Sequence, residues 1–119
     1  MCRVLVVDDE PDLRFVLRRV FERAGHEVFE AGDGAAALRS VAQSRPDLVV
    51  TDIMMPVMDG VELISRLRAE PGTKEIPILS VSGDWQLAAC ADAVLAKPFD
   101  WKELIAVAER LLNEGRGRR

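Results

Sequence analysis

Short apolar runs alternate with longer amphipathic stretches along the chain. Residues 4–7 form a short apolar run that contains β-branched residues and is followed by Asp8, as expected of a strand buried on both faces. The next stretch has apolar residues at helical spacing, and Gly25 then supplies a helix C-terminal cap. We therefore expect a strand followed by an amphipathic helix. The residues expected to face inward are Leu13, Val16, Leu17, Val20, Phe21 and Ala24, and those expected on the other face are Arg14, Arg18, Arg19, Glu22 and Arg23.

The same alternation continues to the end of the chain. Further strands are predicted at residues 28–31, 48–51, 78–81 and 94–96, and further helices at residues 34–43, 60–69 and from Asp100 to near Gly115. Asp33 and Asp100 are expected to cap their helices, and Pro71 to break the one before it. Strands that alternate with helices at this spacing imply right-handed crossovers and a parallel sheet covered on both faces. The sequence thus predicts a doubly wound α/β domain.

Composition narrows the class of protein. A chain of 119 residues with 49% hydrophobic residues suits one globular domain, expected here to span residues 1–115 with an Arg-rich tail at 116–119. A net charge of -4 makes nucleic acid an unexpected partner. The chain has no apolar run of membrane-spanning length and no signal peptide pattern. Cys2 and Cys90 match no metal-ligand spacing, so we expect reduced thiols and a cytoplasmic location.

Polar residues follow the predicted strands at positions where α/β folds gather their chemistry. Asp8, Asp9, Asp52, Ser82 and Lys97 all stand at carboxyl ends of strands. Three carboxylates from two strands repel one another unless a cation lies among them, and Mg²⁺ prefers oxygen ligands. A metal ion, an ammonium group and a hydroxyl group are what a transferring phosphoryl group requires. Asp52, at the end of the central strand, is the best-placed nucleophile.

Four motifs occur in order, each at a strand end: VVDDE at 6–10, TDIMMPVMDG at 51–60, SVSG at 80–83 and AKPF at 96–99. With these motifs the chain resembles a response-regulator receiver domain of two-component signalling. The resemblance implies a flavodoxin/CheY-like sheet with strand order 2-1-3-4-5. It also implies that Asp52 accepts a phosphoryl group from a phosphohistidine on a sensor histidine kinase or phosphotransfer protein, and that the domain slowly dephosphorylates itself.

The resemblance also implies roles for single residues. Asp9, Asp52 and the Met54 carbonyl would bind Mg²⁺ directly, and Asp8 would act through water. Ser82 would bond a phosphoryl oxygen, and Lys97 would pair with the phosphoryl group. The peptide bond between Lys97 and Pro98 is expected to be cis.

Two features depart from the family pattern. Only fourteen residues separate Ser82 from Lys97, roughly seven fewer than in ordinary receivers, or about two helical turns. The family's fourth helix is therefore expected to be shortened or irregular, with at most about two turns over residues 84–91. Val94 also occupies the position of the family's rotating aromatic residue, and a β-branched side chain is stiff at χ1. The usual route of output to a downstream partner is therefore in question.

Other interpretations stay open at this point. Asp8 and Asp9 could simply cap the first helix. The chain could be an interaction module that signals without phosphate. A phosphatase with an aspartyl nucleophile needs a second Asp two residues after Asp52, where this chain has Met54. A flavodoxin-type cofactor binder needs a phosphate-binding loop that is missing after the first strand. His26 is expected to face solvent and to have no chemical role.

Overall fold

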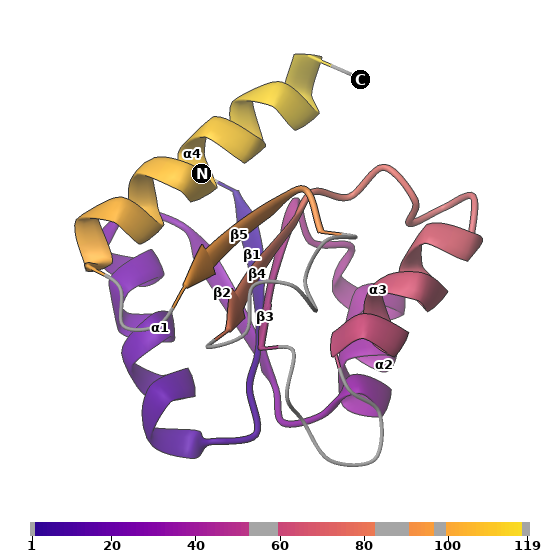
Figure 1. The fold of residues 1–119 in the computed structure, drawn as a ribbon, viewed down its shortest axis with the longest axis horizontal. Helices are drawn as coiled ribbons and strands as arrows, with labels where there is room; N and C mark the ends of the chain where they lie inside the picture. Colours follow the sequence, from indigo (N-terminus) through magenta and orange to yellow (C-terminus); the bar gives the residue numbers. More distant parts are fainter. Residues whose placement is uncertain (1, 53–59, 83–90, 97–99, 118–119) are drawn as a thin grey trace.

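Five parallel strands form one sheet at the centre of the molecule (Figure 1). The computed structural model describes residues 2–52, 60–82, 91–96 and 100–117. The strands are β1 (Arg3–Val7), β2 (Glu27–Ala31), β3 (Leu48–Asp52), β4 (Ile78–Ser82) and β5 (Ala93–Ala96). Their order in the sheet is β2-β1-β3-β4-β5, and every neighbouring pair is parallel. The expected strand order is confirmed.

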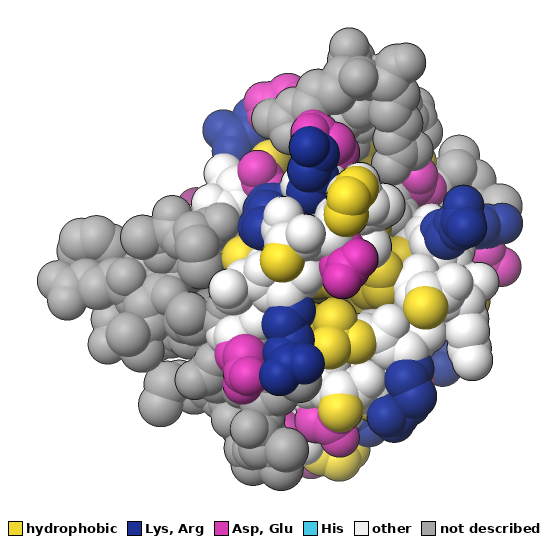
Figure 2. Space-filling model, turned by 90° about the vertical axis from the view of Figure 1, so that its right-hand side faces the viewer, with side chains coloured by type: hydrophobic (Ala, Val, Ile, Leu, Met, Phe, Trp, Pro, Cys, Tyr) yellow, Lys and Arg dark blue, Asp and Glu magenta, His cyan; other side chains and the backbone are white. Residues whose placement is uncertain are grey.

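The described helices lie on both faces of the sheet (Figure 1). They are α1 (Pro11–Arg23), α2 (Gly34–Ser44), α3 (Gly60–Ala69) and α4 (Trp101–Gly117). Helices α1 and α4 cover one face, and α2 and α3 cover the other. This arrangement confirms the predicted doubly wound α/β architecture. On the side of the molecule formed by α2 and α3, Lys and Arg side chains are interspersed with Asp and Glu (Figure 2).

The core explains why the strands read as continuous apolar runs. Val4 and Val6 of β1 belong to the apolar cluster under α1 and α4, whereas Leu5 and Val7 belong to the cluster under α2 and α3. All residues of β3 are buried. Full burial of one such side chain stabilises the fold by roughly 1.5–3 kcal/mol. Because helices cover both faces of the sheet, the successive residues 4–7 of β1 and 48–52 of β3 are buried whichever face they point to.

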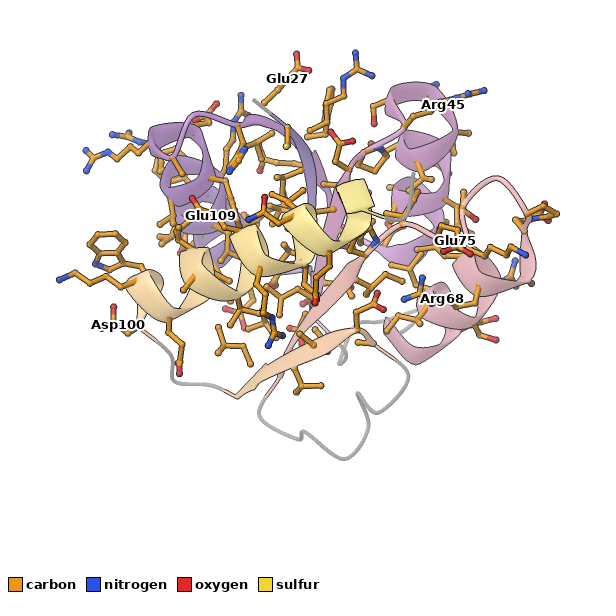
Figure 3. All side chains as sticks on the ribbon, turned by 90° about the horizontal axis from the view of Figure 1, so that it is seen from above. Glu27, Arg45, Arg68, Glu75, Asp100 and Glu109 are labelled. Atoms are coloured by element: carbon orange, nitrogen blue, oxygen red, sulfur yellow. The ribbon has the colours of Figure 1, made fainter. Side chains whose placement is uncertain are left out.

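The helix ends agree closely with the predictions from sequence. Gly25 follows α1 with a φ of 94°, which a residue without a Cβ adopts readily. The Asp33 side chain accepts a hydrogen bond of 2.8 Å from the Ala36 amide at the start of α2. Asp100, labelled in Figure 3, accepts one of 2.9 Å from the Lys102 amide at the start of α4. Helix α4 continues to Gly117, two residues beyond the expected end.

The inward face of α1 is narrower than the sequence predicted. Leu17 and Phe21 are buried, but Val16 is 53% exposed and Ala24 is also exposed. The Arg14 side chain, expected to face solvent, is only 21% exposed. Helix α1 therefore contacts the sheet through a narrow set of residues. Val16 lies outside this contact, and Arg14 lies at its border.

His26 is not the solvent-facing residue that we expected. It is half-buried, and its ring packs at a tilt against Phe21 with ring centroids 6.3 Å apart. The Cys2 amide donates to His26 Nδ1 over 3.4 Å. The sharp turn at Gly25 brings the start of β2 alongside the start of β1, which draws His26 inward. The Cys2 side chain is buried, and Cys90 lies outside the described residues.

Two expectations fall on residues that the structure does not describe. The short helix over residues 84–91 lies almost wholly outside the described ranges, as does the bond between Lys97 and Pro98. Both stay predictions. Within the described ranges, none of the helices combines the length and apolarity needed to cross a membrane.

Candidate functional site

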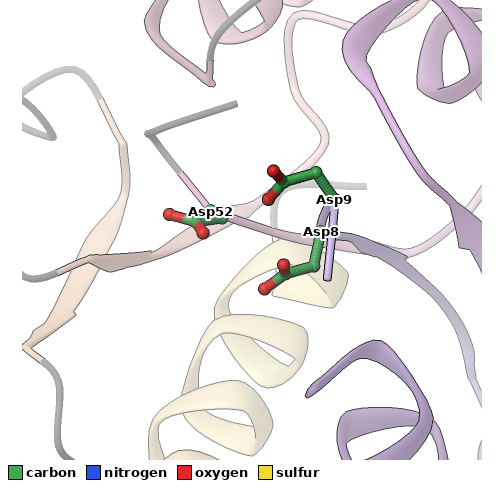
Figure 4. A group of neighbouring side chains, drawn as sticks. All are labelled: Asp8, Asp9 and Asp52. Carbon is green, nitrogen blue, oxygen red and sulfur yellow. The ribbon is translucent and has the colours of Figure 1, made fainter. Parts of the chain in front are cut away.

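Three carboxylates meet at the carboxyl ends of β1 and β3. One oxygen from each of Asp8, Asp9 and Asp52 lies within 4.8 Å of the others, and Figure 4 shows the three side chains pointing the same way. The two strands are neighbours in the sheet, with Val7 opposite Thr51. The residues that follow Val7 and Thr51 therefore emerge side by side, which is why the sequence-predicted cluster forms.

Asp8 is held firmly at the end of β1. Its amide donates to the Ala31 carbonyl over 3.1 Å, which continues the pairing of β1 with β2. Its Oδ1 accepts a 2.9 Å hydrogen bond from the Glu10 amide. Helix α1 is preceded by Glu10, whose own side chain makes no capping bond. Asp8 thus shapes the turn before α1, and its carboxylate is part of the acidic cluster as well.

Burial differs among the three carboxylates. Asp8 and Asp52 are 2% and 8% exposed, whereas Asp9 is exposed. The Thr51 hydroxyl donates to the Asp52 carbonyl over 2.8 Å at the end of β3. Two buried carboxylates and one exposed carboxylate form a site that a cation can approach from solvent.

The donor set suits a hard divalent cation. At these separations each pair of negative carboxylates repels by on the order of 3 kcal/mol at an effective dielectric constant of about 20. A divalent cation among them turns this repulsion into attraction. Mg²⁺ takes oxygen ligands and usually keeps several waters, so one or two direct carboxylates suffice. Asp8, Asp9 and Asp52 therefore fit a Mg²⁺ site with positions open to further oxygen ligands.

The other predicted site residues are placed only through their strands. Ser82 ends β4 and lies opposite Ala96, the residue before Lys97. Strand β4 is also the neighbour of β3, with Asp52 opposite Val81. The backbone positions of Ser82 and Ala96 thus lie at the same edge of the sheet as the acidic cluster. The Ser82 side chain, Met54 and Lys97 lie outside the described residues, and their roles stay predictions.

Arg14 is part of this site, which helical spacing did not predict. Its Nη1 donates to the Asp8 carbonyl over 2.7 Å, and its Nε lies 3.1 Å from Glu30 Oε1 of β2. Arg18, one turn later, bonds Glu30 Oε2 at 2.6 Å and Glu22 Oε2 at 3.2 Å. Hydrogen bonds to Glu30 and then Glu22 raise the pKa of the Arg18 guanidinium. The one signal in the sequence was that Arg14 follows the acidic residues 8–10 by one helical turn.

The chain matches one family model and many characterised proteins. Residues 4–109 match the model described as the response regulator receiver domain. The transcriptional regulatory protein PrrA of Mycobacterium tuberculosis is 44% identical over 116 residues, which cover 93% of this chain and 50% of PrrA. The chain therefore spans about half the length of that relative.

Solved structures agree with this match over nearly the whole fold. The chemotaxis response regulator CheY4 of Vibrio cholerae has a TM-score of 0.87 and 33% identity, with 93% of this chain and 98% of CheY4 covered. The response regulator TrrA of Thermotoga maritima, in complex with Mg²⁺-BeF, has a TM-score of 0.85 and 31% identity, with 93% and 99% covered.

Proposed function

Because the chain belongs to the response regulator receiver domain family, we propose that Asp52 accepts a phosphoryl group from a phosphohistidine. The donor is a sensor histidine kinase or a phosphotransfer protein, and the phosphorylated state changes the affinity of the domain for a downstream protein. The observation that carries this proposal is the convergence of Asp8, Asp9 and Asp52 within 4.8 Å. The Mg²⁺-BeF complex of TrrA supports it, since that relative holds a metal ion together with a beryllofluoride group.

Each residue of the proposed site has a separate role in binding the metal ion or the phosphoryl group. Asp9 and Asp52 would hold Mg²⁺ directly together with the Met54 carbonyl, and Asp8 would do so through water. When bound, the ion neutralises charge on the phosphoryl oxygens and orients them. Ser82 donates a hydrogen bond to one phosphoryl oxygen, and Lys97 pairs with another. These roles rest on the family resemblance and on the strand ends that carry the residues.

Phosphoryl transfer needs only positioning and charge neutralisation from the protein. A carboxylate oxygen of Asp52 attacks phosphorus, and a bond from this oxygen to phosphorus forms. The bond from phosphorus to the imidazole nitrogen of the donor breaks, and its electron pair stays on that nitrogen. A slower hydrolysis ends the signal. Water attacks the phosphorus of the aspartyl phosphate, inorganic phosphate leaves, and the Asp52 carboxylate is restored.

Incubation with acetyl phosphate and Mg²⁺ tests the proposal. We expect the wild type to gain one acid-stable, base-labile phosphoryl group, detected by intact-protein mass spectrometry. Asp52→Asn should gain none, because an amide cannot attack phosphorus but keeps nearly the same shape. Asp12→Asn, in the first turn of α1 and outside the cluster, is the matched control and should be labelled normally.

The other outcomes of this experiment are equally informative. A folded wild type that gains no phosphoryl group would favour a receiver-fold interaction module that signals without phosphate. Label retained on Asp52→Asn would show that another residue is the acceptor.

A further inference from the structure

Asp8 is held by hydrogen bonds at its amide, its side chain and its carbonyl, and the bond at the carbonyl acts on the peptide group that joins Asp8 to Asp9. The Asp8 amide is bonded to Ala31 of β2, and the Asp8 side chain to the Glu10 amide. The carbonyl oxygen of the same residue accepts a 2.7 Å hydrogen bond from Arg14 Nη1. A hydrogen bond from a charged donor is shorter and stronger than one between neutral groups. Arg14 therefore holds the single carbonyl that joins the two carboxylate-bearing residues.

Arg14 is itself held in place by its surroundings. Its Nε lies 3.1 Å from Glu30 Oε1, so that the planar guanidinium bridges the end of β1 and the edge strand β2. It also packs closely over Gly32, where an added Cβ would lie only 3.2 Å from Arg14 Nη1. The side chain is 21% exposed, which limits its alternative rotamers. The Arg14 guanidinium thus links Glu30 of β2 to the carbonyl of Asp8 in the acidic turn at residues 8–10, and we call this link the brace.

This brace has a direct consequence for Asp9. A trans peptide is planar, so fixing the direction of the Asp8 carbonyl also fixes the direction of the Asp9 amide. Asp9 is exposed and follows the last residue of β1 by two positions, so the sheet itself does little to hold it. We propose that Arg14 is a positioning residue, which sets the orientation of the Asp9 carboxylate for Mg²⁺ by bracing the peptide group between Asp8 and Asp9. This inference rests on the proposed function of the acidic cluster.

The direction in which Mg²⁺ affinity changes when Arg14 is replaced by a neutral residue distinguishes a positioning role from a purely electrostatic one. A guanidinium beside a cation site repels the cation, so a neutral substitute tightens Mg²⁺ binding if charge alone matters. If bracing matters, the loss of the brace weakens binding. Replacing a residue that supports a metal ligand typically lowers the affinity for the metal by about ten- to hundredfold.

The experiment is an Mg²⁺ titration by calorimetry on the wild type, Arg14→Gln and Arg14→Lys. We expect the Kd for Mg²⁺ to rise about tenfold or more in Arg14→Gln. Arg14→Lys should also bind more weakly, since an ammonium group keeps the charge but cannot span both partners as a planar fork does. The matched control is Arg18→Gln, which also loses a bond to Glu30, and the partners of Arg18 among the described residues are Glu30 and Glu22 rather than Asp8. Its Kd should stay within about twofold of the wild type.

A second measurement needs no metal. Amide hydrogen exchange of Glu10, whose amide is bonded to Asp8 Oδ1, should be faster in Mg²⁺-free Arg14→Gln than in Mg²⁺-free Arg18→Gln. If Arg14→Gln does not fold, Arg14→Lys and Glu30→Gln carry the same comparison, because each removes one end of the brace.

Three outcomes would overturn the inference: an unchanged Kd in Arg14→Gln, tighter binding in that variant, or an equal loss in Arg18→Gln. A wild type that does not bind Mg²⁺ would instead refute the metal site of the proposed function. The Glu10 exchange comparison would still report on the brace in that case, so the two failures are distinguishable.

Discussion

Asp9 is the one carboxylate of the described cluster that is exposed. Asp8 and Asp52 are buried at strand ends, whereas Asp9 is exposed in the turn before α1. A direct ligand in such a position contributes charge to the metal site but little to the core. Its replacement should therefore affect metal binding far more than folding.

We predict that Asp9→Asn raises the Kd for Mg²⁺ by at least about tenfold, since it removes a charged oxygen ligand. The free energy of unfolding without Mg²⁺ should change by less than about 0.5 kcal/mol, as is usual for surface substitutions. Calorimetric titration and urea unfolding measure the two quantities, with Asp12→Asn as the control on α1. An unchanged Kd would remove Asp9 from the set of direct ligands.

Single residues at strand ends were predictable, whereas their supporting contacts were not. Asp8, Asp9 and Asp52 could be assigned because each follows an apolar run, and parallel strands end at the same edge. Arg14 was assigned to the solvent face, because periodicity gives only the angle of a residue around the helix. A long side chain can fold back over the helix end toward a carbonyl, and no local pattern encodes that choice.

At the scale of elements, Arg68 and Asp92 join α3 to the sheet. Asp92, just before β5, accepts hydrogen bonds from the Ile78 amide at 2.7 Å and from Arg68 Nη2 at 2.5 Å. Arg68 of α3, labelled in Figure 3, also donates to the Lys74 and Ile76 carbonyls. The pair therefore connects the end of α3, the start of β4 and the start of β5.

We predict that Asp92→Ala lowers the free energy of unfolding by about 2 kcal/mol, because it leaves a partly buried amide and a guanidinium without their charged acceptor. Arg66→Gln breaks the exposed pair of Arg66 with Glu62 and should cost less than about 0.5 kcal/mol. Chemical unfolding of both variants tests the contrast. Equal losses would mean that the Asp92 contacts add no more than an ordinary surface ion pair.

Most elements were predictable, since the strand and helix periods differ and Gly25, Asp33 and Asp100 mark helix ends. The errors were small shifts of boundaries, such as the extension of α4 to Gly117. Val16 was the clearer error. Apolar spacing cannot reveal that α1 rests on the sheet through a narrow stripe, which leaves Val16 and Phe15 at 53% and 56% exposure.

At the scale of the whole molecule, one edge of the sheet collects the acidic cluster and the ends of β4 and β5. Val94 of β5 is 36% exposed and lies opposite Ser80 of β4. A stiff valine at this position does not act as a rotating aromatic gate. We therefore expect a response to the proposed phosphorylation of Asp52 to involve Ser82 and the stretch that follows it.

We predict that a beryllofluoride mimic with Mg²⁺ changes amide-exchange protection most in residues 83–93, and less in α4. A phosphoryl group shifts an equilibrium only by binding one conformation better than another, and we expect the Ser82 hydroxyl to make the contact that differs between the two conformations. Ser82→Ala, treated in the same way, should lose most of the change. A larger response in α4, or a full response in Ser82→Ala, would contradict this route.

The overall topology was predictable because four motifs identify the family, and the family has one strand order. Composition and periodicity alone led only to a doubly wound sheet. Which strand lies beside which depends on contacts between distant parts of the chain, such as Val4 with both Val28 and Leu48, and local patterns do not encode these contacts.

The central claim is that Asp52 is the phosphoryl acceptor, and chemical mapping of the modified residue tests it most directly. Borohydride reduces an aspartyl phosphate to homoserine, which tandem mass spectrometry locates in a peptide. After treatment with acetyl phosphate and Mg²⁺, the account predicts homoserine at position 52, and none there when Mg²⁺ is chelated. Homoserine at position 8 or 9, or at no position in a folded protein, would contradict it.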